Sequence, residues 1–75
     1  MKFYFTFGSG QTDKSLRSLF KNYCIIDAPT EDEAREVMHK ARGIKWSMCY
    51  NEDEFKGQPE RYNLKEIPLE EVCLH

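Results

Sequence analysis

The chain has 75 residues, of which 40% are hydrophobic and 32% charged, and its formal net charge is −2 at pH 7. This length excludes a second domain of ordinary size, and this balance of apolar and charged residues excludes a disordered chain. Lysines and arginines are scattered singly among acids, which argues against direct nucleic-acid binding, because such binders cluster their cations.

The first predicted element is a strand from Lys2 to Phe7, with Phe3, Phe5 and Phe7 on its inner face. It ends at a glycine-rich segment in which glycine permits positive φ.

That segment, Gly8, Ser9, Gly10 and Gln11, is the candidate site for a nucleotide or another small ligand, because successive backbone N–H groups can hold an anion. No Lys-Ser/Thr pair follows at P-loop spacing, so a simple turn is the favoured interpretation. A rigid loop that contacts a partner is the third possibility.

The stretch from Gln11 to Phe20 places Leu16, Leu19 and Phe20 at helical spacing. We favour an irregular loop with these three side chains packed on the core. The alternative is a projecting hydrophobic lobe that contacts a partner.

A second strand is predicted from Tyr23 to Asp27, followed by a helix from Thr30 to Gly43. Thr30 and Glu33 form a capping box, and Gly43 is a suitable residue to end the helix. Its predicted apolar stripe consists of Ala34, Val37, Met38 and Ala41.

The third predicted strand alternates large residues, which we expect to point inward: Ile44, Trp46, Met48 and Tyr50. Asn51 and Glu54 then predict a capped short helix anchored by Phe55. An edge strand is expected within Leu64–Ile67, and Leu69–His75 reads as a loose acidic tail.

Together these elements predict one α+β domain over residues 1–75, with 68–75 as the loose tail. A three- to four-stranded sheet packs against one main helix in a ββαβ core, with a short second helix added. If the second and third strands flank the first, the order is 2-1-3 and the two outer strands are parallel.

Few residues are suited to catalysis. The chain has three cysteines, Cys24, Cys49 and Cys73, an odd number with no C-x-x-C pair, which indicates neither a disulfide framework nor a zinc site. Cys24 and Cys49 are expected to be small buried hydrophobic residues. Of the two histidines, His39 is expected to face solvent, and His75 is the last residue. A pair of Cys49 with His39 has no support in the spacing. We therefore expect no enzymatic activity, no cofactor and no metal site.

The N-terminus has no long apolar stretch typical of a signal peptide, and no segment is long enough to span a bilayer, so we expect a cytoplasmic protein that binds no membrane. Two acidic runs, 31–33 and 52–54, fit the rule that acids favour helix N-termini. Alternatively, they form negative clusters that compete for a basic groove on a partner.

Several motifs together carry a family resemblance. They are the F-x-F-G-x-G-Q run of Phe5–Gln11, the helix start Pro29–Arg35, Lys45-Trp46, and the Y-x-E-x-E-F run of Tyr50–Phe55. The chain thus resembles, over about residues 2–67, short uncharacterised proteins encoded by phages and prophages of Gram-positive bacteria. This resemblance implies an accessory protein that binds and inhibits a host protein, such as a CRISPR nuclease or another defence effector, in the host cytoplasm. The Thr12–Lys21 stretch is longer than the corresponding loop expected for this group.

The first hypothesis is therefore a non-enzymatic inhibitor, monomeric or a small homo-oligomer, that binds a host protein through exposed aromatic and acidic residues: Tyr4, Phe20, Glu52, Asp53 and Phe55. The alternative is a module that sequesters a nucleotide or small ligand in the Gly8–Gln11 loop.

Overall fold

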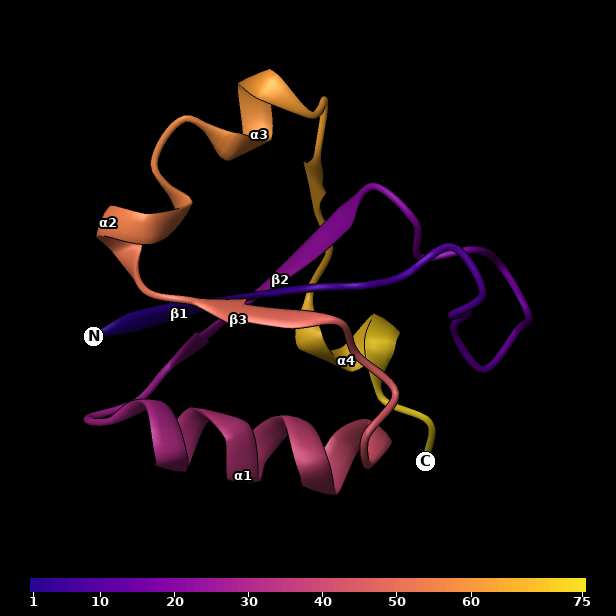
Figure 1. The fold of residues 1–75 in the computed structure, drawn as a ribbon. Coiled ribbons are helices and arrows are strands. Elements are labelled where there is room, and N and C mark those ends of the chain that lie inside the picture. The colour runs from indigo at the N-terminus through magenta and orange to yellow at the C-terminus, as the bar shows by residue number, and fades with distance from the viewer.

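The computed structural model describes all residues from Met1 to His75. In chain order its elements are β1 (Lys2–Thr6), β2 (Asn22–Asp27), α1 (Glu31–Arg42), β3 (Met48–Tyr50), α2 (Glu52–Phe55), α3 (Gln58–Arg61), β4 (Lys65–Glu66) and α4 (Leu69–Val72). Figure 1 shows α1 on one side of the sheet and α2 and α3 on the other.

The four strands form one mixed sheet in the order β3-β1-β2-β4. β1 pairs antiparallel with both β2 and β3, and β4 runs parallel to β2 at the sheet edge. β2 and β3 are therefore parallel to each other, and α1 connects them. The predicted α+β fold and the order 2-1-3 are confirmed, and the expected edge strand is present as β4.

The hydrophobic core lies between α1 and the inner face of the sheet. Phe3 and Phe5 of β1 are 3% and 0% exposed, and Ala34 and Met38 of α1 are fully buried. Val37, however, is 37% exposed, so its expected place in the buried stripe is wrong. The stripe is narrower than predicted because a helix resting on a small sheet buries only the side chains directly above it.

The ends of α1 follow their predicted signals in most respects. The Thr30 hydroxyl accepts a hydrogen bond from the Glu33 N–H at 3.3 Å, although the reciprocal bond of a capping box is absent. Gly43 has a φ of 66° and donates its N–H to the His39 carbonyl at 2.7 Å. Positive φ is the conformation in which glycine is favoured at the end of a helix.

The expected inner face of the third strand is wrong. Only Met48–Tyr50 form β3, and Cys49, which pairs with Phe5, is the residue that faces the core. Met48 and Tyr50 lie on the outer face, opposite Thr6 and Tyr4.

The change of face arises before the strand begins. Ile44 is 83% exposed, and the Trp46 N–H donates to the Ile44 carbonyl in a tight turn. Trp46 itself packs edge-on against Phe5, with ring centroids 5.1 Å apart. The turn interrupts the alternation between Trp46 and Met48, so the two side chains lie on opposite faces.

The outer face of the sheet is covered at one end by α2. Phe55 is 3% exposed and stacks on Tyr4, with centroids 4.6 Å apart and planes 11° apart. The rings of Tyr23 and Tyr50 lie 5.0 and 5.8 Å from it. The capping box of Asn51 and Glu54 is present in full, as predicted, and Phe55 anchors the helix.

The C-terminal segment is not a loose tail, which corrects the expectation for residues 68–75. Val72 of α4 is fully buried in the main core, and the Leu74 N–H donates to the Ala41 carbonyl at 2.9 Å. Arg42 is 4% exposed and donates to the carbonyl oxygens of Lys45, Val72 and Thr12 at 2.7, 2.8 and 2.9 Å.

Residues 11–21 form an irregular loop, as favoured from the sequence, but only one of its three apolar side chains packs on the core. Leu19 is 1% exposed, whereas Leu16 and Phe20 are 82% and 52% exposed. The buried Asp13 carboxylate shapes the loop by accepting hydrogen bonds from the N–H groups of Ser15 and Arg17. These bonds and the Arg17 charge lower the pKa of Asp13, against the opposing effect of desolvation.

Candidate partner-binding groove

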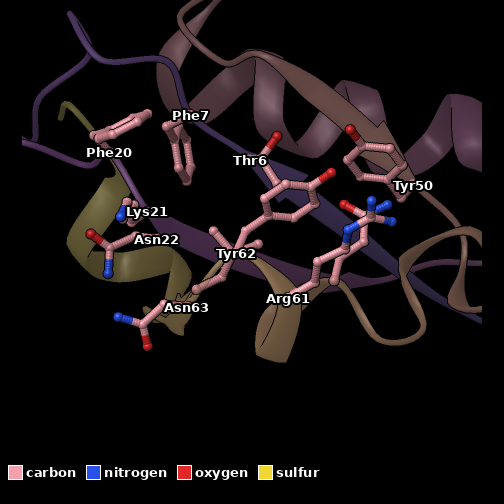
Figure 2. Close-up of a pocket in the computed structure, with 11 residues that line it drawn as sticks. Thr6, Phe7, Phe20, Lys21, Asn22, Tyr50, Arg61, Tyr62 and Asn63 are labelled. Atoms are coloured by element: carbon pink, nitrogen blue, oxygen red, sulfur yellow. The ribbon is translucent and has the colours of Figure 1, made fainter.

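An open groove of about 600 Å³ lies beside α3, on the part of the outer sheet face that α2 leaves uncovered. We call it the aromatic groove, and it is lined by Thr6, Phe7, Phe20, Lys21, Asn22, Tyr50, Gln58, Arg61, Tyr62, Asn63 and Leu64. Figure 2 shows Phe20 and Phe7 toward one end, Tyr50 and Arg61 toward the other, and Tyr62 between them.

Two turns with the same unusual backbone form the rim of the groove. Lys21 and Asn63 have φ values of 68° and 55°, and each directly follows an aromatic residue. Those aromatic residues, Phe20 and Tyr62, are 52% and 53% exposed. The turns lead into the parallel neighbours β2 and β4, so they lie side by side, joined by a 2.9 Å hydrogen bond from the Lys65 N–H to the Lys21 carbonyl.

This backbone conformation has an energetic cost outside glycine. A left-handed residue with a Cβ costs roughly 1–2 kcal/mol, and less for Asn. Strained residues of this kind concentrate at sites that contact ligands or partners. Leu16, outside the groove, has the same conformation with a φ of 66°, so positive φ shapes the two rim turns but does not by itself mark a binding site.

The charged residues in the groove lining are both cationic. They are Lys21 and Arg61, and no Asp, Glu, His or Cys contributes to the lining. The Arg61 guanidinium lies 5.5 Å from the centre of the Tyr62 ring, a cation–π contact that covers part of that ring. The groove therefore combines aromatic surface with positive charge on a molecule whose net charge is −2.

The five predicted partner-binding residues fall in two places. Tyr4, Glu52, Asp53 and Phe55 line a shallow hollow of about 500 Å³ beside α2. Phe20 lies apart from them, on the rim of the aromatic groove.

Exposure within the hollow differs from what we expected. Glu52 and Asp53 are exposed, but Phe55 is buried and Tyr4 is half-buried beneath it. The expectation that both aromatic side chains are exposed is therefore wrong, because they pack on each other to cover the sheet.

The Gly8–Gln11 loop is a closed turn. The Gln11 N–H donates to the Gly8 carbonyl at 3.1 Å, and the Gly8 N–H donates to the Gln11 side-chain oxygen at 2.8 Å. Neither Gly8 nor Gly10 has a positive φ, so the expected reason for glycine there is wrong. The N–H groups of Ser9 and Gly10 have no protein acceptor, and Gly10 borders a hollow that Lys14 and Lys45 also line.

The acidic runs 31–33 and 52–54 occupy the first turns of α1 and α2. Both helices begin at the end of the sheet where the N-terminus lies, on opposite faces (Figure 1). Within α1 the Glu31 carboxylate pairs with Arg35 at 2.8 Å, one helical turn further along, whereas Glu36 and Lys40 form no ion pair.

The cysteines differ in their surroundings. Cys24 is fully buried, as predicted, and burial raises its pKa to about 11. Cys49 is half-buried against the core, where desolvation and then the nearby Glu31 raise its pKa, partly offset by Arg35. His39 is exposed, as predicted.

Sequence reasoning missed Tyr62 and Arg61 of the groove and the buried role of Arg42. The sequence held one signal for the turn that exposes Tyr62. The next residue, Asn63, is of a type that tolerates the left-handed backbone found there. Arg42 had none, since a cation in the last turn of a helix is ordinarily a surface residue.

No cluster of three or more His, Cys, Asp or Glu side chains is arranged to hold a metal ion. None of the helices is long and apolar enough to cross a membrane. No protein-family model matches this chain, and comparison with curated proteins and with solved structures finds no significant similarity.

Proposed function

We propose that this chain is a non-enzymatic module that binds another protein through the aromatic groove. Its resemblance to phage and prophage proteins suggests a specific role, which is stoichiometric inhibition of a host protein. A CRISPR nuclease or another defence effector in the host cytoplasm is the candidate target.

The observation that carries the proposal is the concentration of half-exposed large apolar side chains at the groove. Phe20 and Tyr62 are on its rim, and Met48, which is 50% exposed, lies next to Thr6 on the same sheet face. Aromatic residues and Met are enriched in the centres of protein interfaces, where a few buried side chains carry most of the binding energy. A groove on a rigid sheet also needs little ordering before it binds.

The test is capture of partners from a Gram-positive bacterial lysate with the tagged protein and two matched double variants. Phe20→Ala with Tyr62→Ala removes the groove aromatics. Leu16→Ala with Ile44→Ala removes two apolar side chains, 82% and 83% exposed, that do not line the groove. We expect a saturable partner that the second variant retains and the first one loses.

Purified wild-type protein should then inhibit the activity of the captured partner at about one copy per site. Failure to capture a saturable partner, or equal capture by both double variants, would count against the proposal. Inhibition of purified CRISPR nucleases tests the narrower assignment of the target, and its failure alone leaves the binding role intact.

A second candidate function is the binding of a small anion or nucleotide at the Gly8–Gln11 loop. It is supported by the unpaired N–H groups of Ser9 and Gly10 and by Lys14 and Lys45, which line the hollow that Gly10 borders. Mass spectrometry of denatured, freshly purified protein would reveal a bound nucleotide. A Cβ at Gly10 meets nothing within 4 Å, so Gly10→Val should fold and should lose the nucleotide.

A further inference from the structure

The charges of the aromatic groove narrow the kind of partner that fits it. We propose that its occupant is an acidic segment of a partner protein that carries an aromatic side chain, with negative charges on both sides of that side chain. This inference rests on the proposed protein-binding function and adds the chemistry of the partner.

The first step is the arrangement of the two cations. Lys21 belongs to the turn before β2, and Arg61 ends α3, so different segments supply them. Figure 2 shows Lys21 near the Phe20 end of the groove and Arg61 near the Tyr50 end, with Tyr62 between. Two separated cations match an extended chain with separated acids better than a single phosphate, which is held by donors that converge on one point.

The second step is the absence of competing negative charge inside the groove. The lining has no carboxylate, although the chain has 13 acidic residues against 11 lysines and arginines. An acidic segment therefore meets attraction within the groove, whereas a basic one finds its attraction at the far end of the sheet, where α1 and α2 begin.

The third step is the rigidity of the aromatic surface. The turn that carries Phe20 is fixed by the bond from Lys65 to Lys21, and the turn that carries Tyr62 is fixed by a 2.8 Å bond from the Leu64 N–H to the Pro59 carbonyl. Two aromatic rings held on fixed turns favour a flat side chain from the partner, because ring stacking gives energy beyond the buried area.

The experiment is a titration of the ¹⁵N-labelled full chain at low ionic strength, followed by NMR. The probes are the blocked peptides EEYEE, KKYKK and EEAEE, together with uridine monophosphate. We expect EEYEE to shift the amide signals of Lys21 and Tyr62 and to bind about tenfold more tightly than the other two peptides.

Charge reversal supplies the matched control. Lys21→Glu with Arg61→Glu should weaken EEYEE binding about tenfold, whereas Lys14→Glu with Lys45→Glu, outside the groove, should not change it. Equal binding of KKYKK or EEAEE, tighter binding of the nucleotide at the groove, or no groove shifts with EEYEE at millimolar concentration would overturn the proposal.

Capture of the partner by these variants distinguishes a failure of this inference from a failure of the proposed protein-binding function. If Phe20→Ala with Tyr62→Ala abolishes capture while Lys21→Glu with Arg61→Glu leaves it unchanged, the acidic occupant is wrong and the protein-binding role stands. If neither variant affects capture, both proposals fail.

Discussion

The buried guanidinium of Arg42 joins three segments that lie far apart in the sequence. Its nitrogens donate to the carbonyls of Thr12, Lys45 and Val72, so one side chain connects the long loop, the turn before β3 and the C-terminal helix. It also lies 5.2 Å from the centre of the Phe7 ring. A charged hydrogen bond contributes about 1.5–3 kcal/mol, and a buried acceptor left without a donor costs about 1–3 kcal/mol.

We therefore expect Arg42→Met to lower the free energy of unfolding by about 3 kcal/mol or more, because Met fills part of the volume and supplies no donor. Urea denaturation followed by circular dichroism measures the loss. Lys40→Met, in the same last turn but exposed, is the control and should change stability by no more than about 0.5 kcal/mol. A loss below about 1 kcal/mol for Arg42→Met would show that the three carbonyls find other donors.

The Cys24 thiol predicts a loss of stability in alkaline solution. Burial raises its pKa from 9.0 to about 11 in the folded chain. Between these two values the unfolded chain has lost the proton that the folded chain still holds, so the unfolded state binds fewer protons and stability falls as pH rises. We expect Cys24→Ala to lose less stability than the wild type between pH 9 and 11, measured by urea denaturation at each pH.

Cys73→Ala is the control for that comparison, and it should show the same pH dependence as the wild type. The wild type and both variants retain Tyr23, whose pKa is also raised by desolvation, so its ionisation affects all three proteins equally. The comparison therefore isolates the Cys24 thiol. Identical pH dependence in all three proteins would mean that Cys24 does not ionise differently on unfolding.

At the scale of the elements, α2 depends on one side chain. The helix has only four residues, too few to be stable alone, and Phe55 packs it against the tyrosines of the outer sheet face. We expect Phe55→Ala to cost about 3–5 kcal/mol and to speed hydrogen exchange selectively in residues 51–64.

Phe20→Ala is the matched control for α2, since the same residue type there is 52% exposed. It should cost less than about 1 kcal/mol and leave exchange in 51–64 unchanged. If the two substitutions cost the same, Phe55 would not be the anchor of α2. A stable Phe20 variant is also what the capture experiment requires.

Elements whose signals are local could be predicted from the sequence. Thr30, Gly43 and the Asn51–Glu54 capping box act within one helical turn, so α1 and α2 begin and end close to where their residues indicate. The central place of β1 followed from its alternating phenylalanines, since the most aromatic strand gains most from burial.

Features that depend on distant contacts could not be predicted. The face of β3 changes in a turn held by Arg42, and α4 is ordered because Val72 reaches a core formed by other segments. The groove depends on two left-handed turns that only the pairing of β2 with β4 brings together, and Lys21 carries no local signal for that backbone.

At the scale of the whole molecule, one core holds both ends of the chain. Its ten buried residues run from Phe3 of β1 to Val72 of α4, and Arg42 ties the last helix to the rest. A chain of this size with a single core is expected to unfold in one cooperative transition, with a total stability of roughly 4–11 kcal/mol.

Two probes test this cooperativity because they report on different parts of the molecule. The fluorescence of Trp46, the single tryptophan, follows its contact with Phe5, and far-ultraviolet circular dichroism follows all helices and strands. We expect the two urea transitions to coincide in midpoint and slope. Residues 69–75 cannot detach without exposing Val72 and breaking the hydrogen bond from Arg42 to the Val72 carbonyl. An earlier transition by circular dichroism alone would mean that part of the secondary structure unfolds before Trp46 loses its contact with Phe5, and the expectation of one cooperative transition would be wrong.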